Sequence, residues 1–74
     1  MSLPNLVYMA NQIGKFFVSE NSQTAAADIA DHLKQFWDPR MRLEIIAHLA
    51  AGGEGLDPEA RAAVALLEPP AQSS

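Results

Sequence analysis

Phe36-Trp37-Asp38-Pro39-Arg40-Met41-Arg42 is the stretch that decides the fold, because a helix must begin in the middle of it. The Asp38 carboxylate can accept the orphan N–H groups of a first helical turn, and Pro39 sits where its missing N–H costs nothing. Pro also disfavours helical geometry at the residue before it, so the chain should bend sharply at Asp38. The same Asp-Pro signal returns at Asp57-Pro58, after the break Gly52-Gly53-Glu54-Gly55. Two strong helix-start signals this close together in the sequence predict several short helices.

Apolar residues recur at helical spacing in four segments of the chain. Ser2 is expected to cap the first segment and Ser22 the second, with Asn21 in a left-handed conformation between them. The expected core positions are Leu6, Ala10, Ile13 and Phe17; Ala26, Ile29, Ala30, Leu33 and Trp37; Met41, Ile45, Ile46 and Leu49; and Ala60, Val64 and Leu67. We therefore predict an all-α fold: a small bundle of about four short helices, in one domain over residues 1–68, with a disordered tail at 69–74.

Gly14 interrupts the apolar stripe of the first segment. A glycine inside a helix costs roughly 1 kcal/mol relative to Ala. Two interpretations stay open. With Ala10 it forms a pair of small residues that lets another backbone approach closely, or the helix breaks near this point.

The composition predicts a soluble globular protein. The formal net charge of −4 argues against electrostatic binding to nucleic acid or to anionic lipid. The chain has no Cys, which excludes disulfides and thiolate metal sites and fits a reducing compartment. We see neither a secretion signal nor an apolar run approaching the roughly 18 residues of a membrane span. The expected location is the cytoplasm.

Candidate chemistry is sparse. Asp28 precedes His32 by four residues and Glu44 precedes His48 by four, so each pair shares a helix face. The two pairs could converge on a divalent metal, but we favour surface carboxylate–histidine pairs because nothing in the spacing forces convergence. The glycine-rich break lacks the preceding strand and following Lys of a phosphate-binding loop, so it is interpreted as a helix end plus a turn. We expect no catalytic, cofactor-binding or metal site in this chain.

A protein-binding surface is the remaining candidate. Trp and Arg are the residue types most enriched at binding hot spots, and here they flank a rigid corner. For Trp37 alone we favour a place in the core. Three Phe side chains cannot all be buried in so small a core, so one or two should face a partner, and polar residues beside the apolar stripe could bond a partner's backbone. The predicted partner-binding residues are Asn11, Gln12, Phe16, Phe17, Phe36, Trp37, Arg40 and Arg42.

Three blocks of the sequence resemble one known family. Tyr8-Met9-Ala10-Asn11-Gln12-Ile13-Gly14-Lys15-Phe16-Phe17, the Phe36–Arg42 stretch and Ala51-Gly52-Gly53-Glu54-Gly55-Leu56-Asp57-Pro58 are similar, in this order, to the delta subunit of soluble NAD-dependent formate dehydrogenases. Each block alone would be a weak match, but together they cover most of the chain from about Leu6 to Ala65.

The resemblance implies a bacterial accessory subunit without a catalytic site of its own. In that family a molybdenum or tungsten pterin lies in a large alpha subunit, iron–sulfur clusters and FMN lie in alpha and its beta and gamma partners, and electrons pass to NAD. The implied role is to bind the large catalytic subunit and support assembly, stability or activity. Three alternatives stay open: a transient chaperone for pterin cofactor insertion, a self-associating helical module, and a small metal-binding protein built on the two histidines.

Overall fold

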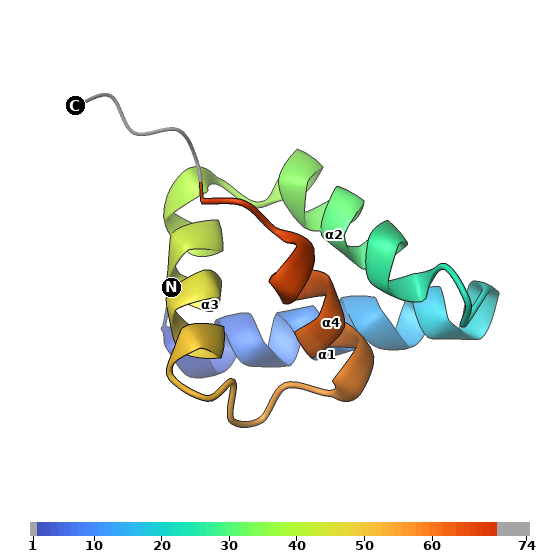
Figure 1. Cartoon of the computed structure of the whole chain (residues 1–74), viewed down its shortest axis with the longest axis horizontal. Coiled ribbons are helices and arrows are strands. Elements are labelled where there is room, and N and C mark those ends of the chain that lie inside the picture. The colour runs from blue at the N-terminus through green and yellow to red at the C-terminus, as the bar shows by residue number, and fades with distance from the viewer. Residues whose placement is uncertain (1, 70–74) are drawn as a thin grey trace.

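The computed structural model describes residues 2–69, which form four helices and no strand (Figure 1). They are α1 (Leu3–Glu20), α2 (Ala25–Phe36), α3 (Pro39–Ala50) and α4 (Pro58–Leu66). This confirms the predicted all-α fold. The tail predicted for residues 69–74 lies outside the described residues except for Pro69.

The start of α3 follows the local chemistry of its Asp-Pro pair. The Asp38 carboxylate accepts a hydrogen bond from the Met41 N–H at 2.9 Å. The backbone at Asp38 is extended, with φ −72° and ψ 167°, so the chain turns sharply between α2 and α3. The predicted corner is therefore confirmed at the residue where the following Pro disfavours helical geometry.

The end of α3 is fixed by its glycines. The Gly53 N–H donates to the His48 carbonyl at 2.8 Å, and the Gly52 N–H donates to the Leu49 carbonyl at 3.0 Å. This pair of bonds is the Schellman motif, which needs a left-handed residue after the helix. Gly52 and Gly53 supply it, with φ of +123° and +65°.

α1 runs unbroken through Gly14, which is buried. A Cβ built on this glycine would lie 3.5 Å from the Ile29 Cδ1 of α2 and 3.8 Å from the Ala60 Cβ of α4. Two other helices thus approach α1 at this point. The close-approach interpretation is confirmed, and the broken-helix alternative is wrong.

The predicted turn between the first two helices is wrong in its details. Asn21 is extended, with φ −162°, and the N-cap of α2 is Thr24, not Ser22. The Asn21 side-chain oxygen accepts a hydrogen bond from the Gln23 N–H at 3.0 Å. This local bond turns the chain by itself, so the left-handed conformation that Asn tolerates is not needed.

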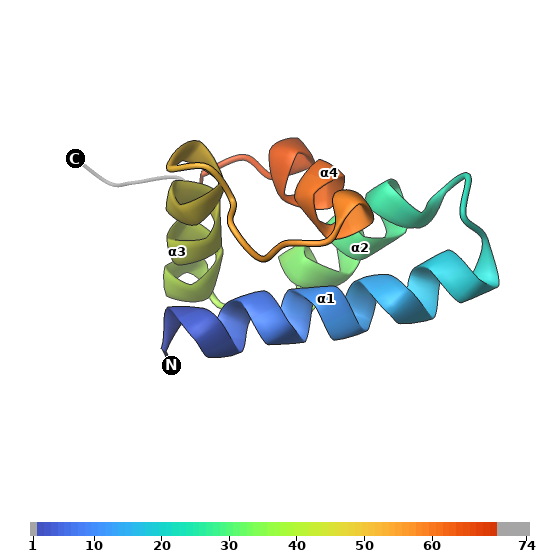
Figure 2. The same cartoon turned by 90° about the horizontal axis from the view of Figure 1, so that it is seen from below.

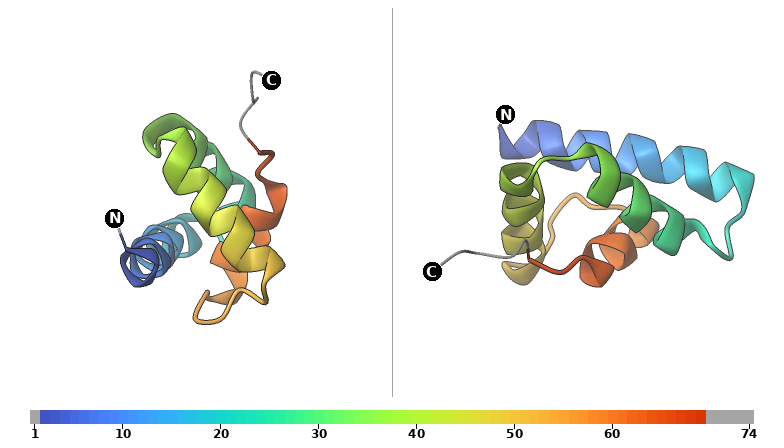
Figure 3. Two further views of the ribbon diagram at one scale, coloured as in Figure 1. Left: turned by 90° about the vertical axis from the view of Figure 1, so that its left-hand side faces the viewer. Right: turned by 90° about the horizontal axis from the view of Figure 1, so that it is seen from above.

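All four helices contribute to one core. α2 and α4 pack against each other on the same side of α1, and α3 stands across the N-terminal end of α1 (Figures 1 and 2). α1 therefore forms one outer side of the molecule, as the two further views also show (Figure 3). The buried apolar residues are Leu6, Ala10, Ala25, Ile29, Ala30, Leu33, Trp37, Ile45, Leu56, Ala60, Ala63, Val64 and Leu67. No helix within residues 2–69 combines the length and the apolar character that crossing a membrane requires.

Candidate protein-binding site

Four aromatic rings from α1 and α2 lie in contact on the surface, and we call Phe16, Phe17, His32 and Phe36 the aromatic patch. The ring centroids of Phe16 and Phe17 are 5.2 Å apart, those of Phe17 and His32 5.7 Å, and those of His32 and Phe36 4.7 Å. Phe16 is 59% exposed and Phe36 is 68% exposed. Exposed aromatic side chains grouped in this way make the patch a candidate for protein binding.

The helix periods explain how the patch forms. His32 and Phe36 are four residues apart in α2, so they share one face of that helix. Phe17 lies at the edge of the apolar stripe of α1 and is half-buried, whereas Phe16 is one position further round and points out. The prediction that the three Phe side chains cannot all be buried is confirmed. His32 is the member that the sequence argument missed, although its spacing from Phe36 carried the signal.

Carboxylates adjoin the aromatic patch. A surface depression is lined by Phe17, Asp28, Asp31, His32, Gln35 and Phe36. The Thr24 hydroxyl donates to the Asp28 Oδ2 at 2.8 Å, which fixes the orientation of that carboxylate. Asp28 is half-buried and Asp31 is exposed. The depression thus combines aromatic walls with negative charge.

The exposed side of α1 extends the apolar character of this surface. Tyr8, Gln12 and Phe16 follow one another at intervals of four residues, and Tyr8 is 63% exposed. Such i, i+4 rows form the ridges by which helices pack together. The outer side of α1 therefore presents a row with an aromatic side chain at either end and Gln12 between them, exposed within the described part of the chain.

The predicted site residues around the Asp-Pro corner divide into two groups. Trp37 is only 5% exposed and belongs to the core, so it can act on a partner only through the residues it supports. Arg40 is exposed. Arg42 is half-buried, and its Nε is buried with no hydrogen-bond partner among the described residues.

The side chain of Asn11, in α1, is hydrogen-bonded to the loop between α3 and α4, which we call the glycine loop (residues 51–57). Its side-chain amide donates to the Gly55 carbonyl at 2.8 Å, and its side-chain oxygen accepts from the Asp57 N–H at 2.8 Å. The carboxamide of Asn11 is therefore occupied within the chain, whereas its neighbour Gln12 is exposed. Nothing in the sequence signals this pairing, because the partners are more than 40 residues away.

Two further side chains fasten the glycine loop. His48 Nε2 donates to the Glu54 carbonyl at 2.7 Å. The Arg61 guanidinium donates to the Gly52 and Gly53 carbonyls at 2.8 and 3.0 Å. The loop is thus held from three helices, α1, α3 and α4.

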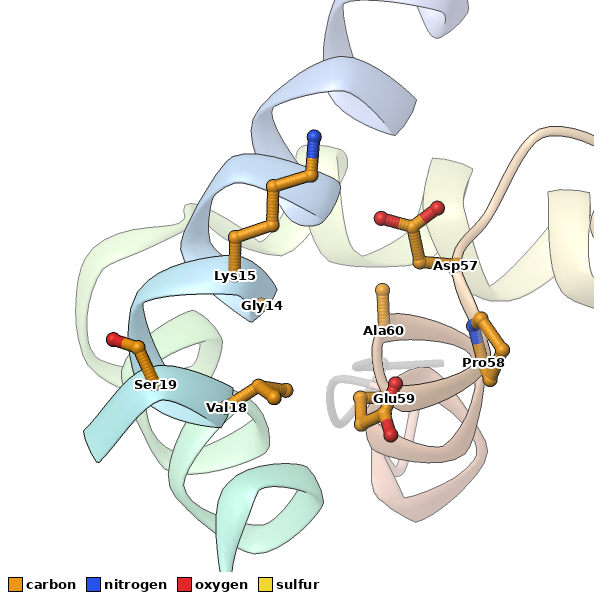
Figure 4. Close-up of a pocket in the computed structure, with 8 residues that line it drawn as sticks. All are labelled: Gly14, Lys15, Val18, Ser19, Asp57, Pro58, Glu59 and Ala60. Carbon is orange, nitrogen blue, oxygen red and sulfur yellow. The ribbon is translucent and has the colours of Figure 1, made fainter. Parts of the chain in front are cut away.

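A groove between α1 and the start of α4 is another concave feature (Figure 4). It is lined by Gly14, Lys15, Val18, Ser19, Asp57, Pro58, Glu59 and Ala60. Lys15 stands on the α1 wall; Asp57, on the loop just before α4, and Glu59, on α4, stand on the opposite wall (Figure 4). The Ser19 hydroxyl donates to the Phe16 carbonyl at 2.7 Å, which is a local bond within α1 and pairs it with no catalytic base.

The two histidines serve separate parts of the structure. His32 belongs to the aromatic patch and His48 to the glycine loop. Over residues 2–69, no three His, Cys, Asp or Glu side chains are grouped so that they could hold a metal ion. The metal-site alternative requires the Asp28–His32 and Glu44–His48 pairs to come together, and within residues 2–69 they do not.

Comparison with known proteins gives one match. A family model described as "NADH-dependant formate dehydrogenase delta subunit FdsD" matches residues 5–64, which is most of the chain. No curated protein and no solved structure matches it.

Proposed function

Because the chain belongs to the family of NADH-dependent formate dehydrogenase delta subunits, we propose that it is a non-catalytic accessory subunit that binds the large catalytic subunit. The family match over residues 5–64 carries this proposal. The exposed aromatic patch supports it, since apolar rings of this size gain from being covered by another protein. In this proposal the redox cofactors and the active site belong to the partner subunits.

The proposed mechanism is stabilisation by mass action. A protein that binds one state of its partner more tightly than the others raises the population of that state. A ligand whose free concentration is 100 times its dissociation constant stabilises the state it binds by about 2.7 kcal/mol. The chain would in this way support assembly, stability or activity of the complex without taking part in the chemistry.

Co-purification tests the proposal. The chain, tagged after Ser74, is expressed with the other subunits, and the eluate is examined by mass spectrometry and assayed for formate-dependent NAD reduction. We expect the large subunit at a one-to-one ratio and activity in the same fraction. A parallel preparation without this chain should give less assembled or less stable enzyme.

Other outcomes of this experiment separate the alternatives. Recovery of a cofactor-free, inactive large subunit alone would favour a transient chaperone for cofactor insertion. Recovery of the small chain alone, as a dimer, would replace the accessory role with that of a self-associating helical module.

A further inference from the structure

We propose that the aromatic patch and the carboxylates of Asp28 and Asp31 together receive an arginine side chain presented by the protein partner. This inference rests on the proposed function, because it specifies what the accessory subunit recognises. It assigns the contact to α1 and α2 and adds Asp28, Asp31 and His32 to the residues predicted from the sequence.

The shape of the depression suits a flat cation. Phe17 and Phe36 lie on either side of His32, with centroids 5.7 and 4.7 Å from it, and the three rings line one hollow. An arginine carries a planar guanidinium that stacks on aromatic faces and an apolar stem that packs against them. Phe36 is 68% exposed, so much of its side chain is accessible to a partner's side chain.

The charge of the depression agrees with its shape. Asp28 and Asp31 are three residues apart in α2, so they are neighbours on the helix surface, and both line the hollow. The Thr24 hydroxyl holds Oδ2 of Asp28, which leaves Oδ1 to accept from a partner. Carboxylates bind guanidinium groups with charge-assisted hydrogen bonds, and a carboxylate fixed in advance loses less entropy on binding.

The charge of the whole chain favours the same kind of partner. With a net charge of −4 the chain attracts a basic protein surface and repels anionic lipid and nucleic acid. Lysine offers a strongly hydrated point charge that stacks poorly, so arginine suits a hollow with aromatic walls better.

The test measures the affinity of the full chain for the purified large catalytic subunit. The double variant Asp28→Asn with Asp31→Asn should bind about tenfold more weakly or worse, with a shallower dependence on salt. Its matched control is Glu54→Gln with Glu68→Gln, which makes the same change in net charge outside the hollow and should leave the affinity within about twofold.

A second variant tests the aromatic walls. Phe36→Ala should also weaken binding by about tenfold or more. The control is Leu66→Ala on α4, which truncates another exposed apolar side chain, one that is 53% exposed. Circular dichroism melting of every variant checks that the fold is kept; Phe36 is largely exposed, so its truncation leaves the core intact.

Each result decides the matter. If the wild-type chain binds and both hollow variants bind equally well, the inference is overturned while the accessory role stands. Failure of the wild-type chain to bind the large subunit overturns both. A wild-type dimer that the Asp28 and Asp31 changes dissociate would assign the hollow to an arginine of a second copy and overturn the proposed partner.

Discussion

At the scale of single residues, Asn11 links α1 to the backbone just before α4. One carboxamide donates to the Gly55 carbonyl and accepts from the Asp57 N–H, both at 2.8 Å. The second bond satisfies the backbone N–H of Asp57, the residue that precedes α4. Asn11 therefore positions α4 on α1 by hydrogen bonding as well as by packing.

Asn11→Ala should destabilise the isolated chain by about 2 kcal/mol, because a part-buried N–H and a carbonyl lose their partners together. Chemical unfolding in urea measures the change. Gln12→Ala, at the exposed neighbouring position, is the control and should stay within about 0.5 kcal/mol of the wild type. Equal stabilities for the two variants would show that the link contributes little.

Two glycines should respond in opposite directions to the same substitution. Gly14 has helical geometry and a new Cβ would meet Ile29 and Ala60 at ordinary contact distances of 3.5 and 3.8 Å. Gly14→Ala should therefore stabilise the chain by about 0.4–1 kcal/mol through helix propensity and chain entropy. In a domain of this size that raises the melting temperature by several degrees, on the order of 4–8 °C per kcal/mol.

Gly53 is the matched control. Its φ is +65°, and a Cβ there would lie 2.9 Å from Leu49 Cδ1 and 3.1 Å from Arg61 Cζ. Gly53→Ala should destabilise by about 1–2 kcal/mol, because L-residues avoid this backbone region. Thermal melts of both variants give the signs, and a lower melting temperature for Gly14→Ala would mean that the α1 contact is tighter than described.

At the scale of helices, α3 and α4 both start with Asp-Pro but are capped differently. The Asp38 carboxylate bonds the Met41 N–H, whereas the Asp57 carboxylate caps nothing. Asn11 accepts a hydrogen bond from the N–H of Asp57 itself, which fixes the residue before α4 but caps no N–H of its first turn. Two identical dipeptides thus begin helices with a side-chain cap in one case and without one in the other.

Asp38→Ala should accordingly cost about 1 kcal/mol of stability, the usual value of a helix cap. Asp57→Ala should cost only a few tenths, from the loss of a negative charge near the helix N-terminus. The two free energies of unfolding, measured side by side in urea, test the difference. If the two variants lose the same free energy of unfolding, the hydrogen bond of the Asp38 carboxylate adds no stability beyond that of its negative charge.

The helices could be predicted where one local interaction decides the backbone. The Asp38 cap and the Gly52-Gly53 end depend on neighbours within five residues, and both were predicted correctly. The conformation of the turn after α1 was predicted wrongly because Asn21 has two local ways to bend the chain, by its backbone or by its side chain. Propensity alone does not choose between them.

The candidate site could be predicted only in part. Crowding among three Phe side chains indicated exposed aromatic surface, and Phe16 and Phe36 are exposed. Which elements meet at that surface depends on how α2 crosses α1, and no residue pattern encodes that crossing. Asn11 was predicted to bond a partner's backbone, but its carboxamide bonds the chain's own glycine loop.

At the scale of the whole molecule, one core joins all four helices, and Trp37 lies in it at the junction of α2 and α3. We expect unfolding in urea followed by Trp37 fluorescence to coincide with unfolding followed by far-UV circular dichroism. A single cooperative core has no part that can melt separately. A fluorescence transition at lower urea than the helix signal would show that the corner between α2 and α3 opens first.

The fastened glycine loop also bears on how the protein meets proteases. A glycine-rich loop is ordinarily an early cleavage site, since a protease must draw several residues of extended backbone into its active-site cleft. Here the loop's carbonyls are held by Asn11, His48 and Arg61, so that stretch cannot be pulled out unless α4 comes away from α1. Resistance to digestion in this loop is thereby tied to the folding of the entire domain.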